Sequence, residues 1–116
     1  MSRDSSDRNV KSSVLTGVNA TAQNIKTGPG YLFKIVAYNN DAPAIRFIQI
    51  FDAAAADVTP GTTVPKYVLP FSYAVMDDND MGIEFDTGIS VAVTTTETGA
   101  TGATVGATIT YVANKN

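Results

Sequence analysis

The stretch Tyr-Leu-Phe-Lys-Ile-Val-Ala-Tyr at residues 31–38 decides the fold class, because it has the composition and the alternation of a β-strand. Successive side chains of a strand point to opposite faces, so positions 31, 33, 35 and 37 share one face and the even positions share the other. The segment Ile-Arg-Phe-Ile-Gln-Ile-Phe at residues 45–51 repeats the pattern after a turn at residues 39–43. Both segments are apolar on both faces, which predicts central strands with one face in the core and the other covered by an arm, a loop or another chain.

Weaker strands are expected on either side of this pair, separated by Gly, Pro and Asn/Asp turns. On the amino-terminal side they occupy residues 10–16 and 20–26, before the breaker Thr-Gly-Pro-Gly at residues 27–30. On the carboxyl-terminal side, residues 52–64 are expected to form a loop. Residues 66–69 then form a strand that Pro65 and Pro70 place at a sheet edge, and residues 71–76 continue it after a kink.

The last part of the chain predicts a polar turn at residues 77–80, strands at 82–85 and 89–95, and a Gly-rich mobile loop or loose hairpin tip at 98–107. In the strand at 89–95, the odd-numbered side chains are expected to face the core, while Ser90, Ala92 and Thr94 face outward. A closing strand at 108–113 points Ile109 and Tyr111 inward. About eight antiparallel strands without a helix predict an all-β, single-domain jelly roll or β-sandwich over residues 10–116, preceded by a flexible amino-terminal arm at residues 1–9.

The composition limits the chemistry that the chain can perform. The 116 residues include no His, no Cys and no Trp. His is the usual acid or base near neutral pH, and His and Cys supply many nucleophiles and zinc ligands, so most nucleophilic, redox and zinc mechanisms lack their standard residues. A hydrophobic content of 44% with 16% charged residues is typical of a globular domain. We therefore expect a structural or binding protein that is not an enzyme and has no cofactor or metal.

Charge and hydropathy narrow the range of partners. A net charge of −3 does not favour nucleic acid as a partner. Residues 1–46 carry a net charge of +3 and residues 47–116 carry a net charge of −6. One interpretation is that the two halves complement each other between subunits, and the other is that these are scattered solvated charges. No apolar run reaches the ~18 residues of a membrane helix, and the polar start of the chain lacks the apolar core of a secretory signal. We expect no membrane partner and synthesis in a cytoplasm.

Acidic residues offer three alternatives to a purely structural role. The Asp-Asp-Asn-Asp run at residues 77–80 is the densest set of oxygen ligands, but it lacks the spacing of a calcium loop, which favours a solvated turn. Glu84 and Asp86 share one face of a strand, as a glycosidase pair would, yet no Trp offers a platform for a sugar. Asp86-Thr87-Gly88 matches the triplet of aspartic proteases, but so short a motif arises by chance. The aromatic residues at 31, 33, 38, 47 and 51 are expected in the core rather than on a ligand surface.

The central segments resemble those of small virion proteins of tailed bacteriophages. The resemblance rests on residues 31–40, residues 45–52, the connector Thr-Pro-Gly-Thr-Thr-Val-Pro at 59–65, and Gly-Ile-Glu-Phe-Asp-Thr-Gly-Ile at 82–89. It covers residues 31–112, and its motifs are turns and core positions. It implies a jelly-roll or β-sandwich subunit on the phage head, of the capsid decoration or cement type. Such proteins often form trimers that hold neighbouring major capsid subunits together.

The function expected on these grounds is a non-enzymatic decoration protein on the capsid exterior, synthesised in the host cytoplasm. Its partners would be the major capsid protein and copies of itself in a homotrimer, with neither nucleic acid nor membrane involved. The alternative is a receptor-binding, glycan-binding or structural module of the phage tail. The contact residues are expected in the amino-terminal arm and on the outer faces of the two central strands: Arg3, Asp4, Asp7, Arg8, Lys34, Tyr38, Arg46 and Ile48.

Overall fold

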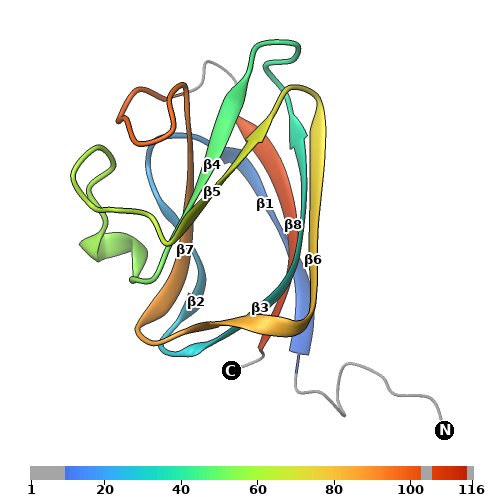
Figure 1. Cartoon of the computed structure of the whole chain (residues 1–116), viewed down its shortest axis with the longest axis vertical. Helices are drawn as coiled ribbons and strands as arrows, with labels where there is room; N and C mark the ends of the chain where they lie inside the picture. The colour runs from blue at the N-terminus through green and yellow to red at the C-terminus, as the bar shows by residue number, and fades with distance from the viewer. Residues whose placement is uncertain (1–9, 103–105, 115–116) are drawn as a thin grey trace, which may run out of the picture.

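The computed structural model describes residues 10–102 and 106–114, which form an all-β single domain of eight strands (Figure 1). The arm expected at residues 1–9, with Arg3, Asp4, Asp7 and Arg8, lies outside the described residues. Within them, one 3-10 turn, η1 (Ala55–Asp57), interrupts the predicted loop at 52–64. The strands are β1 (Val10–Val18), β2 (Gln23–Thr27), β3 (Gly30–Asn39), β4 (Arg46–Phe51), β5 (Tyr67–Phe71), β6 (Ala74–Phe85), β7 (Gly88–Thr94) and β8 (Ala107–Asn114).

Two four-stranded antiparallel sheets pack face to face (Figure 1). One has the strand order β1-β8-β3-β6 and the other has the order β2-β7-β4-β5. The first strand therefore pairs with the eighth, the second with the seventh, the third with the sixth and the fourth with the fifth. Strands β1 and β6 are the edges of the first sheet, and β2 and β5 are the edges of the second. The all-β prediction is confirmed, including the edge position of the strand expected at residues 66–69, although this strand, β5, continues through Pro70 to Phe71.

The core lies between the two sheets. Alternate side chains of each strand point into it, which is the arrangement that a sandwich requires. On β8, Ile109 and Tyr111 are buried as predicted, and on β7 the odd-numbered residues Ile89, Val91 and Val93 belong to the same cluster. The largest other members of the core are Leu32, Ile35, Ile48, Ile50, Phe71 and Phe85.

The alternation predicted for residues 31–38 breaks at Phe33. Strand β3 pairs Leu32 with Ala113 of β8 and Lys34 with Val112, so two steps along β3 correspond to one step along β8. Strand β3 therefore contains one extra residue, a β-bulge. After the bulge the parity changes, and Leu32, Ile35 and Ala37 are the residues that face the core. Tyr38 points outward and is 55% exposed, so its predicted burial is wrong.

Of the other aromatic residues expected in the core, Tyr31 is also exposed, whereas Phe51 is buried. Tyr31, at the start of β3, is 40% exposed, although the alternation predicted it in the core. Phe51, at the end of β4, is fully buried as predicted. It lies outside the cluster between the sheets, because its side chain is on the opposite face of its sheet from Ile48 and Ile50.

The polar turn predicted at residues 77–80 is wrong, because these residues lie inside β6. As an edge strand, β6 has one side without a partner strand, and an edge tolerates and even favours charged residues. The irregularity in this region is a bulge in β6 that holds several extra residues. Leu32 pairs with Ile83 and Lys34 pairs with Asp78, so five steps along β6 correspond to two along β3. Gly82, with φ of 82°, supplies the left-handed backbone that this bulge uses.

Loops cover the outer face of the second sheet. Ser90, Ala92 and Thr94 on β7 are buried, although the sequence placed them facing outward. The Ser90 hydroxyl donates to the Ala53 carbonyl oxygen at 2.8 Å, and Thr94 Oγ1 donates to the Thr96 carbonyl oxygen at 2.7 Å. The chain around η1 and the loop after β7 thus shield this face, on the left in Figure 1.

Candidate interaction surface

The outer face of the β1-β8-β3-β6 sheet carries the residues best placed to contact a partner. Strand register aligns Val14, Thr110, Val36 and Met76 in one row that crosses all four strands. Val14 is 53% exposed and Met76 is 64% exposed. Because aligned residues of neighbouring strands point to the same side of a sheet, this row is a band of three apolar side chains and the Thr110 hydroxyl side chain across the molecule; we call it the apolar band.

Two further rows flank this band. Tyr38 is aligned with Thr108 of β8 and Ala74 of β6. On the other side, Lys34 is aligned with Val112 of β8 and Asp78 of β6. We call these three rows together the open face. Lys34 and Tyr38, two of the contact residues predicted from sequence, therefore lie on one surface, with the apolar band between them.

The open face differs from the outer face of the second sheet in what covers it. On the second sheet, Gln49 is fully buried and its Nε2 donates to Thr94 Oγ1 at 2.8 Å and to the Gly99 carbonyl oxygen at 3.1 Å. On the first sheet, no loop among the described residues buries Val14, Tyr38 or Met76. A large exposed apolar surface on one side of a small domain is typical of an interaction site.

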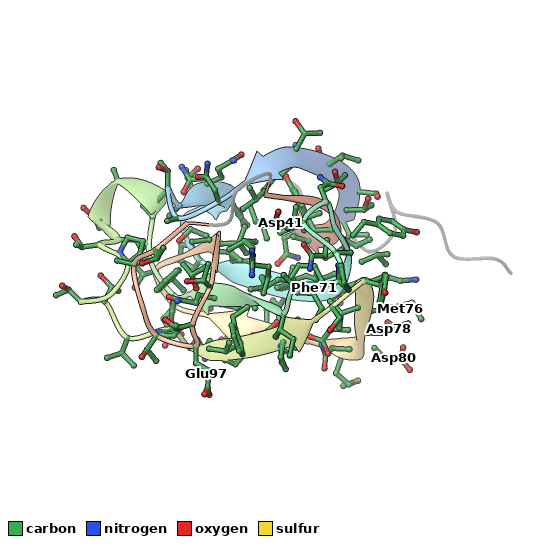
Figure 2. The ribbon with its side chains drawn as sticks, turned by 90° about the horizontal axis from the view of Figure 1, so that it is seen from above. Asp41, Phe71, Met76, Asp78, Asp80 and Glu97 are labelled. Carbon is green, nitrogen blue, oxygen red and sulfur yellow. The ribbon has the colours of Figure 1, made fainter. Side chains whose placement is uncertain are left out.

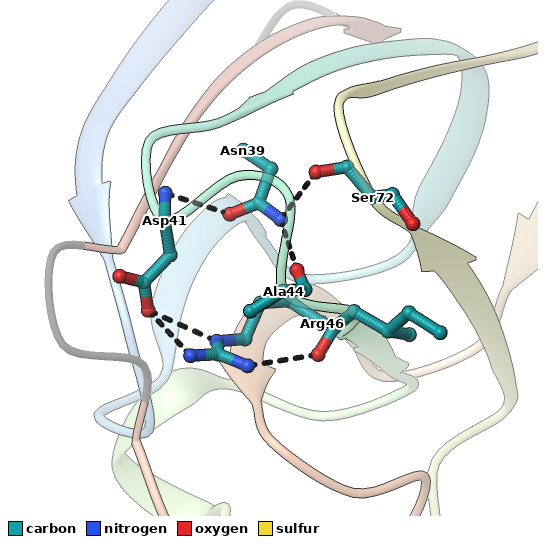
Figure 3. A network of polar contacts seen from close by, with 6 residues as sticks. Asn39, Asp41, Ala44, Arg46 and Ser72 are labelled. Atoms are coloured by element: carbon teal, nitrogen blue, oxygen red, sulfur yellow. Dashed lines mark hydrogen bonds and ion pairs between the residues drawn. The ribbon is translucent and has the colours of Figure 1, made fainter.

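Two predicted contact residues do not belong to this surface. Ile48 is fully buried between the sheets, so it has no exposed surface to offer a partner. The sequence placed it on an outer face because β4 is apolar on both sides. Arg46, at the start of β4, is bound within its own chain: Nε and Nη2 donate to Asp41 Oδ2 at 3.0 and 2.7 Å, and Nη1 donates to the Ile45 carbonyl oxygen at 2.9 Å (Figure 3).

Arg46 is part of a polar network that fixes the β3–β4 connection at one end of the sandwich (Figure 3). Its centre is Asn39, whose Nδ2 donates to the carbonyl oxygens of Ala44 and Ser72, both at 2.7 Å. Asn39 Oδ1 accepts from the Asp41 backbone N–H at 2.9 Å. The Asn39 side chain therefore joins the β3–β4 turn to the β5–β6 turn, and we assign this network a structural role.

The Asp-Thr-Gly triplet at residues 86–88 is a turn that another carboxylate holds. Asp52 accepts from the backbone N–H groups of Thr87 at 2.8 Å and of Asp86 at 3.1 Å, with Gly88 at 3.4 Å. Slight burial raises the pKa of Asp52. The three N–H groups and the charge of Lys66 together lower this pKa by more than burial raises it, so it lies below its usual value. The triplet thus binds Asp52 with its backbone, and the Asp86 side chain is exposed.

The acidic residues of β6 are spread along the strand and do not converge. Asp78 and Asp80 point outward together with Met76 (Figure 2). Asp77 turns to the other side, where it accepts from the Tyr67 hydroxyl at 3.4 Å and from Asn79 Nδ2 at 3.2 Å. Burial raises the pKa of Tyr67, and the negative charge of Asp77 and its hydrogen bond add to this effect. Over residues 10–102 and 106–114, no three acidic side chains gather as metal ligands.

The sequence pointed to two of the open-face residues and missed the others. Val14 lies in a Ser/Thr-rich run, and Met76 was assigned to a kinked edge strand, so neither pattern indicated exposure. Their common surface depends on the pairing of β1 with β8 and of β3 with β6, which joins segments distant in sequence. Local alternation carries no information about such pairing.

None of the protein-family models, curated proteins or solved structures compared with the chain matches it. No helix in the described part of the chain is long and apolar enough to cross a membrane.

Proposed function

We propose that this chain is a non-enzymatic decoration protein of a tailed phage, which binds the outside of the major capsid lattice through its open face and stabilises the head. The observation that carries the proposal is the difference between the two outer faces of the sandwich. One is buried under the chain's own loops, and the other exposes Val14, Tyr38 and Met76 across four strands. A decoration subunit requires such a broad surface on a rigid scaffold, because its many weak contacts are repeated by the symmetry of the head.

We assign the sandwich to the jelly-roll type. In the two sheets β1 pairs with β8, β2 with β7, β3 with β6 and β4 with β5. A long antiparallel hairpin that is rolled up brings these pairs together, so the pairing supports this assignment. Jelly rolls recur in viral capsid domains. The fold alone does not define a function, so this assignment adds to the resemblance of residues 31–112 to small phage virion proteins and does not replace it.

A binding assay on capsids tests the proposal. Heads purified without this protein are mixed with the parent chain or with variants, and co-sedimentation measures the bound fraction. Tyr38→Lys places a charge on the open face, and we expect it to weaken binding by about tenfold or more, because a desolvated charge is costly in an apolar interface. Tyr73→Lys is the matched control, since Tyr73 is 68% exposed in the β5–β6 turn.

A second pair repeats the comparison with a smaller side chain. Val14→Lys is expected to weaken binding in the same way, whereas Val64→Lys, in the loop before β5, is expected to leave it unchanged. Full binding by both open-face variants would contradict the proposed surface. Binding of the parent chain to tails or glycans and not to heads would instead favour the tail module.

A further inference from the structure

Two methionines of the chain lie on the surface of one edge strand. The sequence has three methionines, and Met1 lies outside the described residues. Met76 and Met81 both belong to β6, where Met76 is 64% exposed and Met81 is 89% exposed. Within the described part of the chain, no methionine is buried in the core between the sheets. Both side chains are therefore accessible to solutes, and a chemical change at either one leaves the core packing as it is.

The two side chains differ in their place relative to the open face. Met76 lies in the apolar band, aligned with Val36 of the neighbouring strand β3, and Figure 2 shows it on the outer side of the molecule. Met81 is outside the three rows of the open face, because it lies in the bulge of β6, at residues 79–82, which have no aligned partner on β3. One exposed methionine thus belongs to the proposed contact surface, and the other is a matched control on the same strand.

The thioether of an exposed methionine reacts with peroxides. The sulfur lone pair attacks one oxygen of hydrogen peroxide, and the O–O bond breaks as the S–O bond forms. The proton of the transferred oxygen passes to the departing hydroxide, which leaves as water. Sulfur is oxidised by two electrons and the peroxide is reduced by two. The product, methionine sulfoxide, is a polar side chain in place of an apolar one, and methionine sulfoxide reductases reverse the change.

We propose that Met76 is an oxidation site that controls the open face: a peroxide converts its thioether to the sulfoxide, and the oxidised chain binds the capsid lattice more weakly. The sulfoxide oxygen accepts hydrogen bonds, but Val36, the aligned neighbour of Met76, has no side-chain donor, and the Thr110 hydroxyl is two strands away. Burying this oxygen in an apolar contact without a donor is costly. The inference rests on the proposed function for its partner, and it adds a reversible regulation of the same surface.

The chemistry is tested first on the isolated chain. Hydrogen peroxide is added, and peptide mapping by mass spectrometry follows the sulfoxide at each methionine. Met76 and Met81 are expected to react at rates within about threefold of each other, because both side chains are exposed. Far-ultraviolet circular dichroism is expected to stay unchanged, since neither side chain packs in the core. A Met76 that resists oxidation while Met81 reacts overturns the inference.

Binding to heads purified without this protein tests the consequence. Peroxide is removed before mixing, and each chain is compared with its own untreated sample, so that differences in basal affinity cancel. Oxidation of the parent chain is expected to raise the dissociation constant by about tenfold, because a polar oxygen then enters the apolar contact. The same treatment is expected to have no effect on Met76→Leu, which has no thioether at this position, and to weaken Met81→Leu as much as the parent. An equal loss in Met76→Leu overturns the inference.

A footprint on decorated heads locates the oxidation site relative to the contact. Peroxide is expected to oxidise Met76 about tenfold more slowly on heads than in the isolated chain, because a covered side chain is shielded from solutes. Met81 is expected to react at the same rate in both samples. A Met76 that is oxidised equally fast on heads lies outside the contact, and that result overturns the inference even though the chain binds.

Enzymatic reduction completes the test. Methionine sulfoxide reductases for both sulfoxide epimers are expected to restore binding by the oxidised parent chain, and failure to restore it contradicts a reversible switch. The untreated samples separate this inference from the proposed function. An untreated parent chain that does not bind heads contradicts the proposed function, and the inference fails with it. Untreated binding that survives complete oxidation of Met76 contradicts the inference alone.

Discussion

Single residues hold the turns of this fold, and Asp52 is the clearest case. Its carboxylate accepts from three successive backbone N–H groups in the turn between β6 and β7, with N–O distances between 2.8 and 3.4 Å. A loop carboxylate that binds successive amides acts as a cap does at a helix start, because it pairs donors that the turn leaves open. The pKa of Asp52 is lowered accordingly.

We predict that Asp52→Asn lowers the free energy of unfolding by about 1 kcal/mol at neutral pH. This value is below the usual range for hydrogen bonds to a charged group, because Asp52 is partly solvated. Since the pKa of Asp52 in the folded protein lies below its ordinary value of 3.8, the contribution of Asp52 to stability is complete above that value and is lost as pH falls through the folded pKa. Urea unfolding at several pH values measures this. Asp86→Asn is the control, and an equal effect of both substitutions contradicts the role of Asp52.

Gly82 provides a second prediction at this scale. Its φ is 82°, and a Cβ added there would lie 2.8 Å from Phe33 Cε1. Gly82→Ala is therefore expected to lower the free energy of unfolding by about 1–2 kcal/mol from backbone strain, and by more where Phe33 cannot move. Gly17→Ala isolates the strain, since Gly17 has φ of 61° and no atom within 4 Å of the added Cβ. Thermal unfolding that ranks Gly17→Ala as the costlier change would count against the close approach to Phe33.

At the scale of elements, the sequence predicts strands better than it predicts their surroundings. The apolar runs in residues 45–51 and 108–113 were sufficient to place β4 and β8. Buried positions recur with period two in β8, whereas the last four residues of β4 are all buried. The predicted alternation failed at Phe33, since one bulge residue exchanges the two faces of a strand. It also failed at residues 77–80, where four polar residues continue an edge strand and do not end it.

The candidate surface was harder to predict than the strands. Lys34 and Tyr38 could be identified from an apolar strand with a second apolar face, but nothing local distinguishes an open face from one that loops cover. Ser90 and Thr94 look like solvent-facing positions and are buried, because the chain near Ala53 and the loop after β7 fold over them. Such cover depends on distant segments, so it follows only from the three-dimensional structure.

Gln49 gives a prediction at the scale of the covered sheet. Its side chain links β4 to the loop after β7 through donations to Thr94 Oγ1 and to the Gly99 carbonyl oxygen. We expect Gln49→Leu to lower the free energy of unfolding by about 1–2 kcal/mol, because the Gly99 carbonyl oxygen loses its side-chain donor.

Hydrogen exchange locates the effect of this substitution. The Thr95 N–H, which donates to the Thr101 carbonyl oxygen at 3.0 Å, is expected to exchange faster in Gln49→Leu than in the parent. Amides of β1 at the far side of the sandwich serve as the internal control. Uniformly faster exchange throughout the chain would show global destabilisation and would contradict a local role in holding the loop.

At the scale of the whole molecule, the two outer faces of this small domain differ. One outer face is covered by loops, and the other exposes the apolar band. A subunit arranged in this way has one broad exposed face for the proposed contact with a lattice. Such a contact gains from repetition, since effective concentration rises once the first contact forms.

The copy number of this chain in purified virions is the most direct test of whether it covers a phage head. Quantitative mass spectrometry measures the amount of the chain relative to the major capsid protein. We predict a ratio near one or a simple symmetric fraction of it, because decoration follows the capsid lattice. A few copies per particle would place the chain in the tail or neck, and its absence from virions would contradict the proposed function.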